Sequence, residues 1–179
     1  IKDKLVEMTH LNETIYSTGI ASSYQATELK SGAYICDDMI ANVCKHHVTK
    51  MPYEIGRLAQ DLAGGLMVTM PSQKEFEHPE LGPMIEKYLK GRKEIATEDR
   101  MRIMRLIENM TLGRNAVGYL TESMHGAGSP QAQRIQISRQ MQIEFKKQRA
   151  KNLAGIAPDS AEEISNDLVG YMERVFSTD

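Results

Sequence analysis

The sequence has no tryptophan, only three phenylalanines and only two cysteines among its 179 residues. So few aromatic side chains, together with twelve methionines, are typical of an aliphatic helical interior rather than a β-sandwich. No apolar run approaches the roughly 18 residues of a membrane span, and the start shows no signal-peptide pattern. We therefore expect a cytoplasmic, all-α protein that does not enter a membrane.

Neither sign of charge is in large excess, because 22 Lys and Arg residues face 24 Asp and Glu residues, for a net charge of −2. This balance gives no reason to expect nucleic acid or an anionic membrane surface as a partner. Internal repeats, low-complexity tracts and the nucleotide-binding pattern Gly-x-Gly-x-x-Gly are also missing. The length suits one domain with a substantial core.

The cysteines and histidines do not predict a metal site. Cys36 and Cys44 are placed in one helix, where about 1.5 Å of rise per residue keeps them too far apart for a disulfide, so we expect buried free thiols. His46 and His47 point about 100° apart on a helix and cannot converge on one ion with Cys44 without help from another chain. His10 has no second ligand three or four residues away and is better explained as a packed imidazole.

Apolar residues recur at helical spacing in four long segments. These segments cover about residues 1–26, 34–64, 97–118 and 130–154. Pro52 should interrupt and restart the second helix, and Thr97 should cap the third. Residues 70–91 suggest a surface excursion with one small helix. The pattern predicts an antiparallel four-helix bundle with short extra helices.

The C-terminal tail is expected to lie outside this bundle. It begins at Pro158, and its apolar spacing predicts a short separate amphipathic helix. We therefore divide the chain into a bundle domain, residues 1–156, and an extension, residues 157–179. Because the chain begins with Ile1 rather than methionine, we expect it to be a segment of something longer.

One stretch, TESMHGAGSPQAQR between the third and fourth helices, concentrates groups suited to chemistry. It contains the carboxylate of Glu122, two glycines, Gly126 and Gly128, that let the backbone approach a ligand, and Ser129 as an N-cap before Pro130. Amide groups at the start of the following helix favour an anion such as a phosphate or a thioester enolate oxygen. The alternative is that this loop merely connects two helices.

Further segments carry a resemblance to a known family. Read together with the loop, they resemble the C-terminal part of the 4-hydroxybutyryl-CoA dehydratases, which belong to the 4-hydroxyphenylacetate 3-hydroxylase family, over roughly residues 1–156. These segments are NMTLG at 109–113, NVCK at 42–45, PYEI at 52–55 and AGGLMVTMP at 63–71. The resemblance implies a helical bundle of the acyl-CoA dehydrogenase C-terminal type that forms the centre of a tetramer.

The resemblance also implies an activity. Such enzymes remove the β-hydrogen and the γ-hydroxyl of 4-hydroxybutyryl-CoA to give crotonyl-CoA, and they isomerise vinylacetyl-CoA, using FAD and a [4Fe–4S] cluster. The cluster ligands precede the matched region, so no cysteine or histidine of this chain is assigned to them. FAD and the cluster are expected in the complete enzyme, whose N-terminal portion binds them, and neither is expected stoichiometrically in this chain alone.

The site residues follow from the same resemblance. Glu122 is implied as the acid/base residue, with Gly126 and Ser129 beside the cofactor. The competing view is that Glu122 pairs with Arg114 or Arg134 and only shapes the loop. The sequence departs from the family pattern at Leu120, where an arginine is expected, and at Arg114.

A second group is implied at the end of the second helix. The pattern Asp61-x-x-Gly64-Gly65 is similar to the Gln-x-x-Gly-Gly of acyl-CoA dehydrogenases, which approaches the adenosine diphosphate part of a neighbouring subunit's FAD. The alternative here is a glycine that simply ends the helix.

Two other classes of function stay open. A flavin-dependent monooxygenase of the 4-hydroxyphenylacetate 3-hydroxylase type would share the bundle, and a non-catalytic assembly subunit would need no chemistry. In each case we expect a homo-oligomer, dimer or tetramer, because the glutamine-rich and methionine-rich helix faces exceed what one small bundle can cover.

Overall fold

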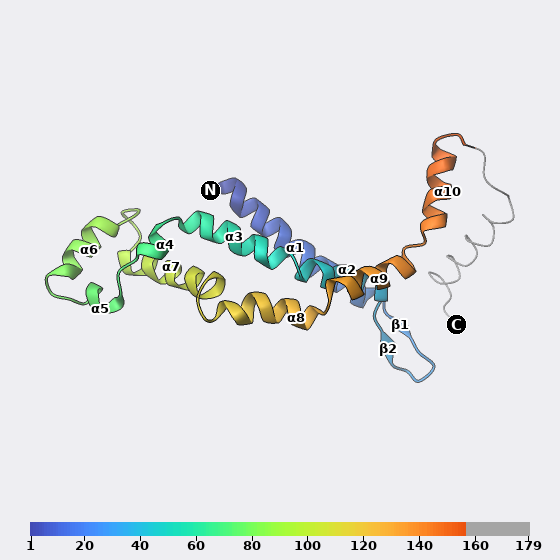
Figure 1. Cartoon of the computed structure of the whole chain (residues 1–179), viewed down its shortest axis with the longest axis horizontal. Coiled ribbons are helices and arrows are strands. Elements are labelled where there is room, and N and C mark those ends of the chain that lie inside the picture. Colours follow the sequence, from blue (N-terminus) through green and yellow to red (C-terminus); the bar gives the residue numbers. More distant parts are fainter. Residues whose placement is uncertain (157–179) are drawn as a thin grey trace. The chain divides into compact units, whose positions relative to one another are not determined.

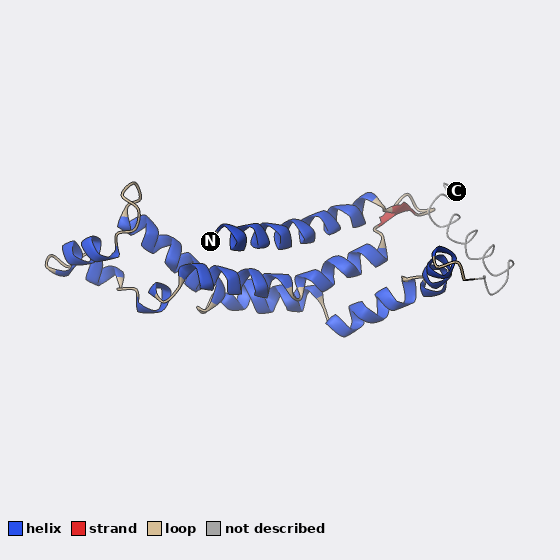
Figure 2. Ribbon diagram, turned by 90° about the horizontal axis from the view of Figure 1, so that it is seen from above, coloured by secondary structure: helices blue, strands red, loops and turns tan. Residues whose placement is uncertain are grey.

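The computed structural model describes residues 1–156, which are mostly helical (Figure 2). Contacts divide the chain into two compact units, Ile1–Arg134 and Ile135–Asp179. The all-α class is confirmed, and the antiparallel four-helix bundle stays a prediction. The predicted helical extension at 157–179 lies outside the described residues. Within residues 1–156, no helix is long and apolar enough to cross a membrane.

In the first unit, the N-terminal helix α1 (Lys2–Tyr24) packs against α2 (Asp38–Val48) and α3 (Met51–Ala63) (Figure 1). A short antiparallel hairpin, β1 (Thr27–Glu28) and β2 (Tyr34–Ile35), joins α1 to α2. The carboxylate of Asp37 accepts a hydrogen bond from the Ile40 amide at 2.7 Å and so caps α2. The predicted restart at Pro52 is confirmed, because this residue lies in the first turn of α3.

The two cysteines do not share a helix. Cys36 lies between β2 and the cap of α2 and is exposed, whereas Cys44 lies inside α2. The Cys44 thiol is 3.5 Å from the Ile15 carbonyl oxygen, where α2 packs on α1. The expectation of two buried thiols in one helix is therefore wrong, because Cys36 is exposed outside the helix and Cys44 is only half-buried. The hairpin occupies residues that the sequence pattern assigned to the helix.

The middle of the first unit is a series of short helices leading to a long one. The short helices are α4 (Leu66–Thr69), α5 (Gln73–Phe76) and α6 (Leu81–Leu89), and the long one is α7 (Thr97–Thr111). The region predicted to hold one small helix thus holds two, α5 and α6. Helices α3, α4 and α6 all pack on α7.

Thr97 does not cap α7 as predicted, because it is already the first residue of that helix. Its side chain is 2% exposed, and its hydroxyl donates a hydrogen bond to the Glu86 carbonyl of α6 at 3.3 Å. The hydroxyl therefore connects two helices instead of ending one.

The third and fourth predicted helices are each interrupted. After α7 the chain turns, because the amides of Leu112 and Gly113 both donate to the Glu108 carbonyl, and it continues as a π-helix, η1 (Val117–Glu122), and then α8 (Ser123–Ala127). The predicted helix from 130 to 154 is divided into α9 (Pro130–Gln140) and α10 (Ile143–Leu153). Gln142 separates them with a left-handed backbone, φ 48°, which no continuous helix allows.

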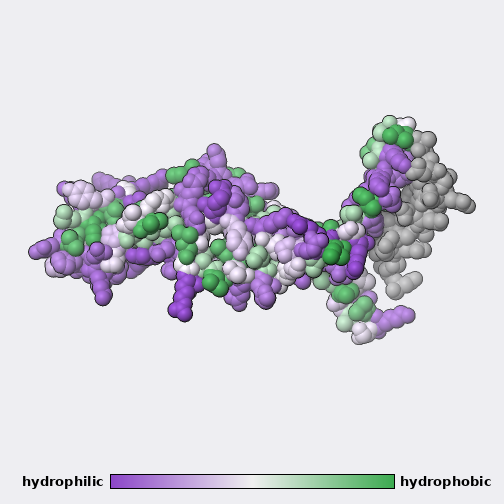
Figure 3. Space-filling view, in the orientation of Figure 1, coloured by the Kyte–Doolittle hydropathy of each residue, from purple (hydrophilic) through white to green (hydrophobic). Residues whose placement is uncertain are grey.

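Few apolar side chains are buried in the first unit. The buried ones come from α1, α3, α4, the residue after α4, α7 and α8, and are Leu11, Leu58, Ala63, Met67, Met70, Met101 and Ala127. Large apolar side chains such as Ile20 on α1 and Leu106 on α7 stay more than half exposed. Green apolar patches accordingly lie at the surface among the purple polar residues (Figure 3). The chain therefore presents apolar surface suited to further protein contacts.

Candidate functional site

Glu122 is the last residue of η1 and directly precedes α8. Its side chain is exposed and turns back along η1, since a Cβ built on Gly118 would lie 3.5 Å from its Oε2 atom. Within residues 1–156, Glu122 forms no ion pair, so the alternative pairing with Arg114 or Arg134 is not observed. Within residues 1–156, the carboxylate is thus exposed and without an ion-pair partner.

The π-helix packs on α3 and on α7. Leu120 lies over Gly56 of α3, where a Cβ would be 4.0 Å from its Cδ2 atom. The Tyr53 hydroxyl of α3 lies 3.9 Å from the sulfur of Met124 in the adjoining α8. The position where the family pattern predicts an arginine therefore holds an apolar side chain beside α3. Single π-turns occur frequently at functional sites, because the wider turn changes the direction of the side chains that follow.

The loop between α8 and α9 has the predicted cap. Gly128 ends α8 with φ 89°, and the Ser129 hydroxyl accepts a hydrogen bond from the Ala132 amide at 3.4 Å. Pro130 is the first residue of α9, as predicted. Because Pro130 has no N–H and the Ala132 amide is capped, the Gln131 amide is the one in this first turn that can face an anion.

Sequence reasoning missed Gln133, which is 3% exposed. Its Nε2 atom donates to the carbonyl oxygens of Ala127, at 2.7 Å, and Gly128, at 3.3 Å. Two carbonyl acceptors on one side identify that atom as the nitrogen. The Oε1 atom is buried without a hydrogen-bond partner in the described part of the chain, which costs about 1–3 kcal/mol.

A usable sequence signal for Gln133 did exist. The residue lies four positions after the N-cap Ser129, and the preceding helix ends at a glycine. A long polar side chain at that position can reach back to the last carbonyls of the preceding helix, which have no partner within it. The sequence pattern instead grouped Gln133 with the other glutamines of a predicted contact face.

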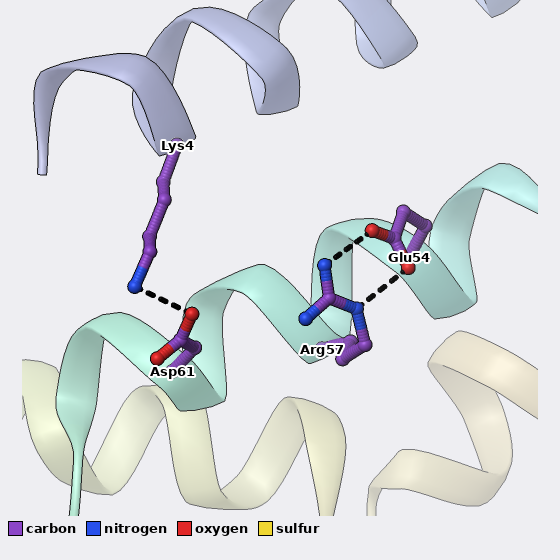
Figure 4. A network of polar contacts seen from close by, with 4 residues as sticks. All are labelled: Lys4, Glu54, Arg57 and Asp61. Carbon is purple, nitrogen blue, oxygen red and sulfur yellow. Dashed lines mark hydrogen bonds and ion pairs between the residues drawn. The ribbon is translucent and has the colours of Figure 1, made fainter.

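The second predicted group lies at the end of α3. The Asp61 carboxylate is 2.5 Å from the Lys4 ammonium of α1, and Glu54 and Arg57 pair one turn earlier on α3 (Figure 4). The hydrogen bond from Lys4, followed by its charge, lowers the pKa of Asp61 below its ordinary value.

Gly64 ends α3, as the alternative interpretation proposed. Its φ is 63°, and its amide donates to the Gln60 carbonyl at 2.9 Å. Gly65 follows as the residue before α4. A Cβ built on Gly64, Gly65 or Gly126 would meet nothing within 4 Å, so a ligand can approach the backbone at all three positions.

Among residues 1–156, no hydrogen bond or ion pair joins the two predicted groups. Leu120 lies over Gly56, whereas Gly64 lies eight residues further along the chain, about 12 Å along the axis of α3. The segment that carries Glu122 and the group around Asp61 and Gly64 therefore lie at different points along α3.

The histidines of α2 form no metal centre with their neighbours. In the part of the chain that the structure describes, no three His, Cys, Asp or Glu side chains lie close enough to hold a metal ion. Burial, together with the nearby His46 and Lys50, lowers the pKa of His47.

Removing the ammonium of Lys4 should raise the pKa of Asp61. We expect Lys4→Met to bring the Asp61 carboxyl towards its ordinary value, which an NMR titration of the side-chain carbons would measure. Because the folded pKa is depressed, the pair stabilises the fold above the ordinary carboxyl pKa and loses this effect as the pH falls through the folded value. Both groups are partly exposed, so the stabilisation should be small and weaken with salt.

Glu54 is the internal control for that titration. Its pKa is lowered mainly by the hydrogen bond from Arg57, which does not involve Lys4, and should not change in Lys4→Met. An Asp61 carboxyl that titrates at the same pH with and without Lys4 would contradict the assignment.

The fold and the sequence together define the class of protein. The chain matches the family HpaB, 4-hydroxyphenylacetate 3-hydroxylase C terminal, over residues 1–155, and it belongs to that family.

Its relatives include acyl-CoA dehydratases. The chain is 53% identical over 164 residues to the 4-hydroxybutyryl-CoA dehydratase/vinylacetyl-CoA-Delta-isomerase of Clostridium aminobutyricum, covering 87% of this chain and 34% of that protein. It is also similar to the structure of an oxygen-tolerant archaeal 4-hydroxybutyryl-CoA dehydratase from N. maritimus, with a TM-score of 0.81 and 66% identity over 99% of this chain and 35% of that one. The chain thus spans about a third of the length of these relatives.

A more distant structure shares the fold alone. The oxygenase component of 4-hydroxyphenylacetate 3-monooxygenase has a TM-score of 0.73 and 21% identity, over 85% of this chain and 32% of that one. Another structure of that oxygenase is a complex with FAD and 4-hydroxyphenylacetate.

Proposed function

We propose that this chain is the C-terminal part of a 4-hydroxybutyryl-CoA dehydratase that also isomerises vinylacetyl-CoA. The observation that carries the proposal is the 53% identity to such an enzyme over 87% of the chain. The alternative, a flavin-dependent 4-hydroxyphenylacetate 3-monooxygenase, has weaker support, because the chain is only 21% identical to that oxygenase. The N-terminal portion of the same enzyme completes the site.

The proposal includes an assembly. The helices would form a four-helix bundle of the acyl-CoA dehydrogenase C-terminal type, in a dimer or tetramer. Its support is the exposed apolar surface of α1 and α7, which a single copy of residues 1–156 leaves uncovered.

The residues of this chain are compatible with contacts to FAD. Gly64, Gly65 and Gly126 leave open space beside their backbone, and the first turn of α9 offers the Gln131 amide and the Ser129 hydroxyl. Lys4 neutralises Asp61, which reduces the repulsion between this carboxylate and a pyrophosphate group. FAD, when bound, would supply reversible electron transfer, with no net oxidation or reduction over the dehydration.

The iron–sulfur cluster has no matching ligand set in residues 1–156. The cysteines of this chain do not fit it either, because Cys36 is exposed beside the hairpin and Cys44 packs against α1. We assign the cluster to the N-terminal portion of the enzyme.

In the proposed reaction, 4-hydroxybutyryl-CoA gives crotonyl-CoA and water. Glu122 takes a proton from a carbon α or β to the thioester, and the return of a proton at the γ carbon, whose hydroxyl leaves as water, gives the methyl group of crotonyl-CoA. Its carboxylate has no ion-pair partner within residues 1–156, which suits that role. The Gln131 amide at the start of α9 would stabilise negative charge on the thioester oxygen. Isomerisation of vinylacetyl-CoA needs the same proton transfer and the same stabilisation of negative charge, because it moves a hydrogen within the acyl chain.

The test is an assay of the complete enzyme that carries this segment. We expect crotonyl-CoA to form from both 4-hydroxybutyryl-CoA and vinylacetyl-CoA. Hydroxylation of 4-hydroxyphenylacetate in the presence of reduced flavin, without crotonyl-CoA formation, would overturn the proposal in favour of the monooxygenase. An assembled protein without either activity would leave the assembly subunit as the function.

A further inference from the structure

We propose that Gln133 is a positioning residue for the Glu122 segment, acting through the carbonyl groups that end α8. This inference rests on the proposed function and extends it to a residue outside the predicted site. The amide nitrogen of Gln133 is bonded to Ala127 and Gly128, and Glu122 lies at the other end of α8.

The carbonyls at the end of α8 need a partner from outside that helix. Helix α8 ends when Gly128 adopts φ 89° and ψ −178°, so its last carbonyls have no following helical amide. Ala127 is buried, which keeps water from replacing the missing donor. The Gln133 side chain returns from α9 and supplies both hydrogen bonds.

The amide nitrogen of Gln133, which donates both hydrogen bonds, explains why a glutamine occupies this position. The Oε1 atom of Gln133 is buried and has no hydrogen-bond partner among residues 1–156. If the side chain served only to fill space, a nonpolar side chain of the same length would cost less free energy to bury. The two bonds that Nε2 makes therefore account for a polar group at this buried position.

The consequence is that the end of α8 is fixed relative to the start of α9. Gln133 joins the last residues of α8 to the helix whose first turn carries Ser129 and the Gln131 amide. The proposed base at one end of α8 and the proposed anion site at the start of α9 are thereby held in one geometry. Catalytic rates are sensitive to displacements of about 1 Å between such groups.

The test is Gln133→Met in the complete enzyme, which keeps the length of the side chain and removes both amide atoms. We expect kcat to fall by up to about 100-fold, with KM, flavin absorbance and thermal unfolding close to those of the unmodified enzyme. Gln136→Glu and Gln136→Met, at an exposed glutamine of the same helix, are the matched controls and should leave kcat unchanged.

Gln133→Glu gives a second readout. An ionised carboxylate repels the two carbonyls, whereas a protonated one can donate one hydrogen bond. The ratio of its kcat to that of the unmodified enzyme should therefore rise as the pH is lowered, which a simple packing role would not produce.

Two results would overturn the positioning role. One is a Gln133→Met enzyme with unchanged kcat. The other is a loss of kcat that is fully accounted for by loss of flavin or of folded protein. Failure of the proposed function is distinguishable from both, because the unmodified enzyme would then form no crotonyl-CoA.

Discussion

Replacing Glu122 by glutamine in the complete enzyme should lower turnover by about 100- to 10,000-fold without loss of flavin. Glutamine keeps the size and the hydrogen-bonding reach of the side chain but cannot accept a proton from carbon. In this chain the carboxylate forms no ion pair within residues 1–156, so its removal should break no structural contact. Conversion of both 4-hydroxybutyryl-CoA and vinylacetyl-CoA should be measured, together with the flavin absorbance.

Glu144→Gln is the matched control for this substitution. Glu144 is an exposed carboxylate on α10 that pairs with Lys147 at 2.6 Å, a surface interaction of little energetic value. Turnover should stay near that of the unmodified enzyme. If Glu122→Gln also keeps near-normal turnover with intact flavin, the carboxylate is not the proton acceptor and the loop has a structural role.

The largest effect on stability is expected for Gly82→Ala. Gly82 is a buried residue in the first turn of α6, and its amide donates to the His78 carbonyl at 2.8 Å. A Cβ at this position would overlap the backbone carbonyl oxygen of Phe76 at the end of α5. Because the capping box formed by Ser72 and Glu75 holds α5, that carbonyl cannot move freely.

The free energy of unfolding of Gly82→Ala should therefore fall by about 1–3 kcal/mol, as urea unfolding followed by circular dichroism would show. Gly19→Ala is the opposite control, since Gly19 also lies in a helix but its added Cβ would be 3.7 Å from the Cys44 sulfur, an ordinary contact. That variant should be more stable by about 0.5–1 kcal/mol. Equal stability of the two variants would show that α5 and α6 do not approach so closely.

Sequence reasoning was most successful where a local rule determines the backbone. Pro52 lies in the first turn of α3, Ser129 caps α9 and Gly64 ends α3, since each depends on the chemistry of one or two neighbouring residues. The helical class likewise follows from the apolar periodicity, which packing between helices requires.

Predictions failed where tertiary contacts decide the outcome. Periodicity did not reveal the hairpin before α2, the break at Gln142 or the interhelical bond of Thr97. For the candidate site, the sequence identified Glu122 but neither the π-helix that carries it nor the buried Gln133 behind it. The π-helix packs on α3 and α7, and Gln133 bonds back from α9 to the end of α8, and neither contact is encoded by a single segment.

The π-helix makes the length of the segment from Val117 to Glu122 as important as its composition. A π-turn contains about one residue more than an α-turn, so deletion of a single residue could restore regular α-helical hydrogen bonding. That shorter helix would be locally more regular and would leave the residues after it in nearly the same orientation, because six π-helical residues turn the chain about as far as five α-helical ones. The side chains inside the segment would change direction instead, including Leu120, which lies beside α3. Among sequences related to this one, point substitutions in the segment should therefore be tolerated more readily than insertions or deletions.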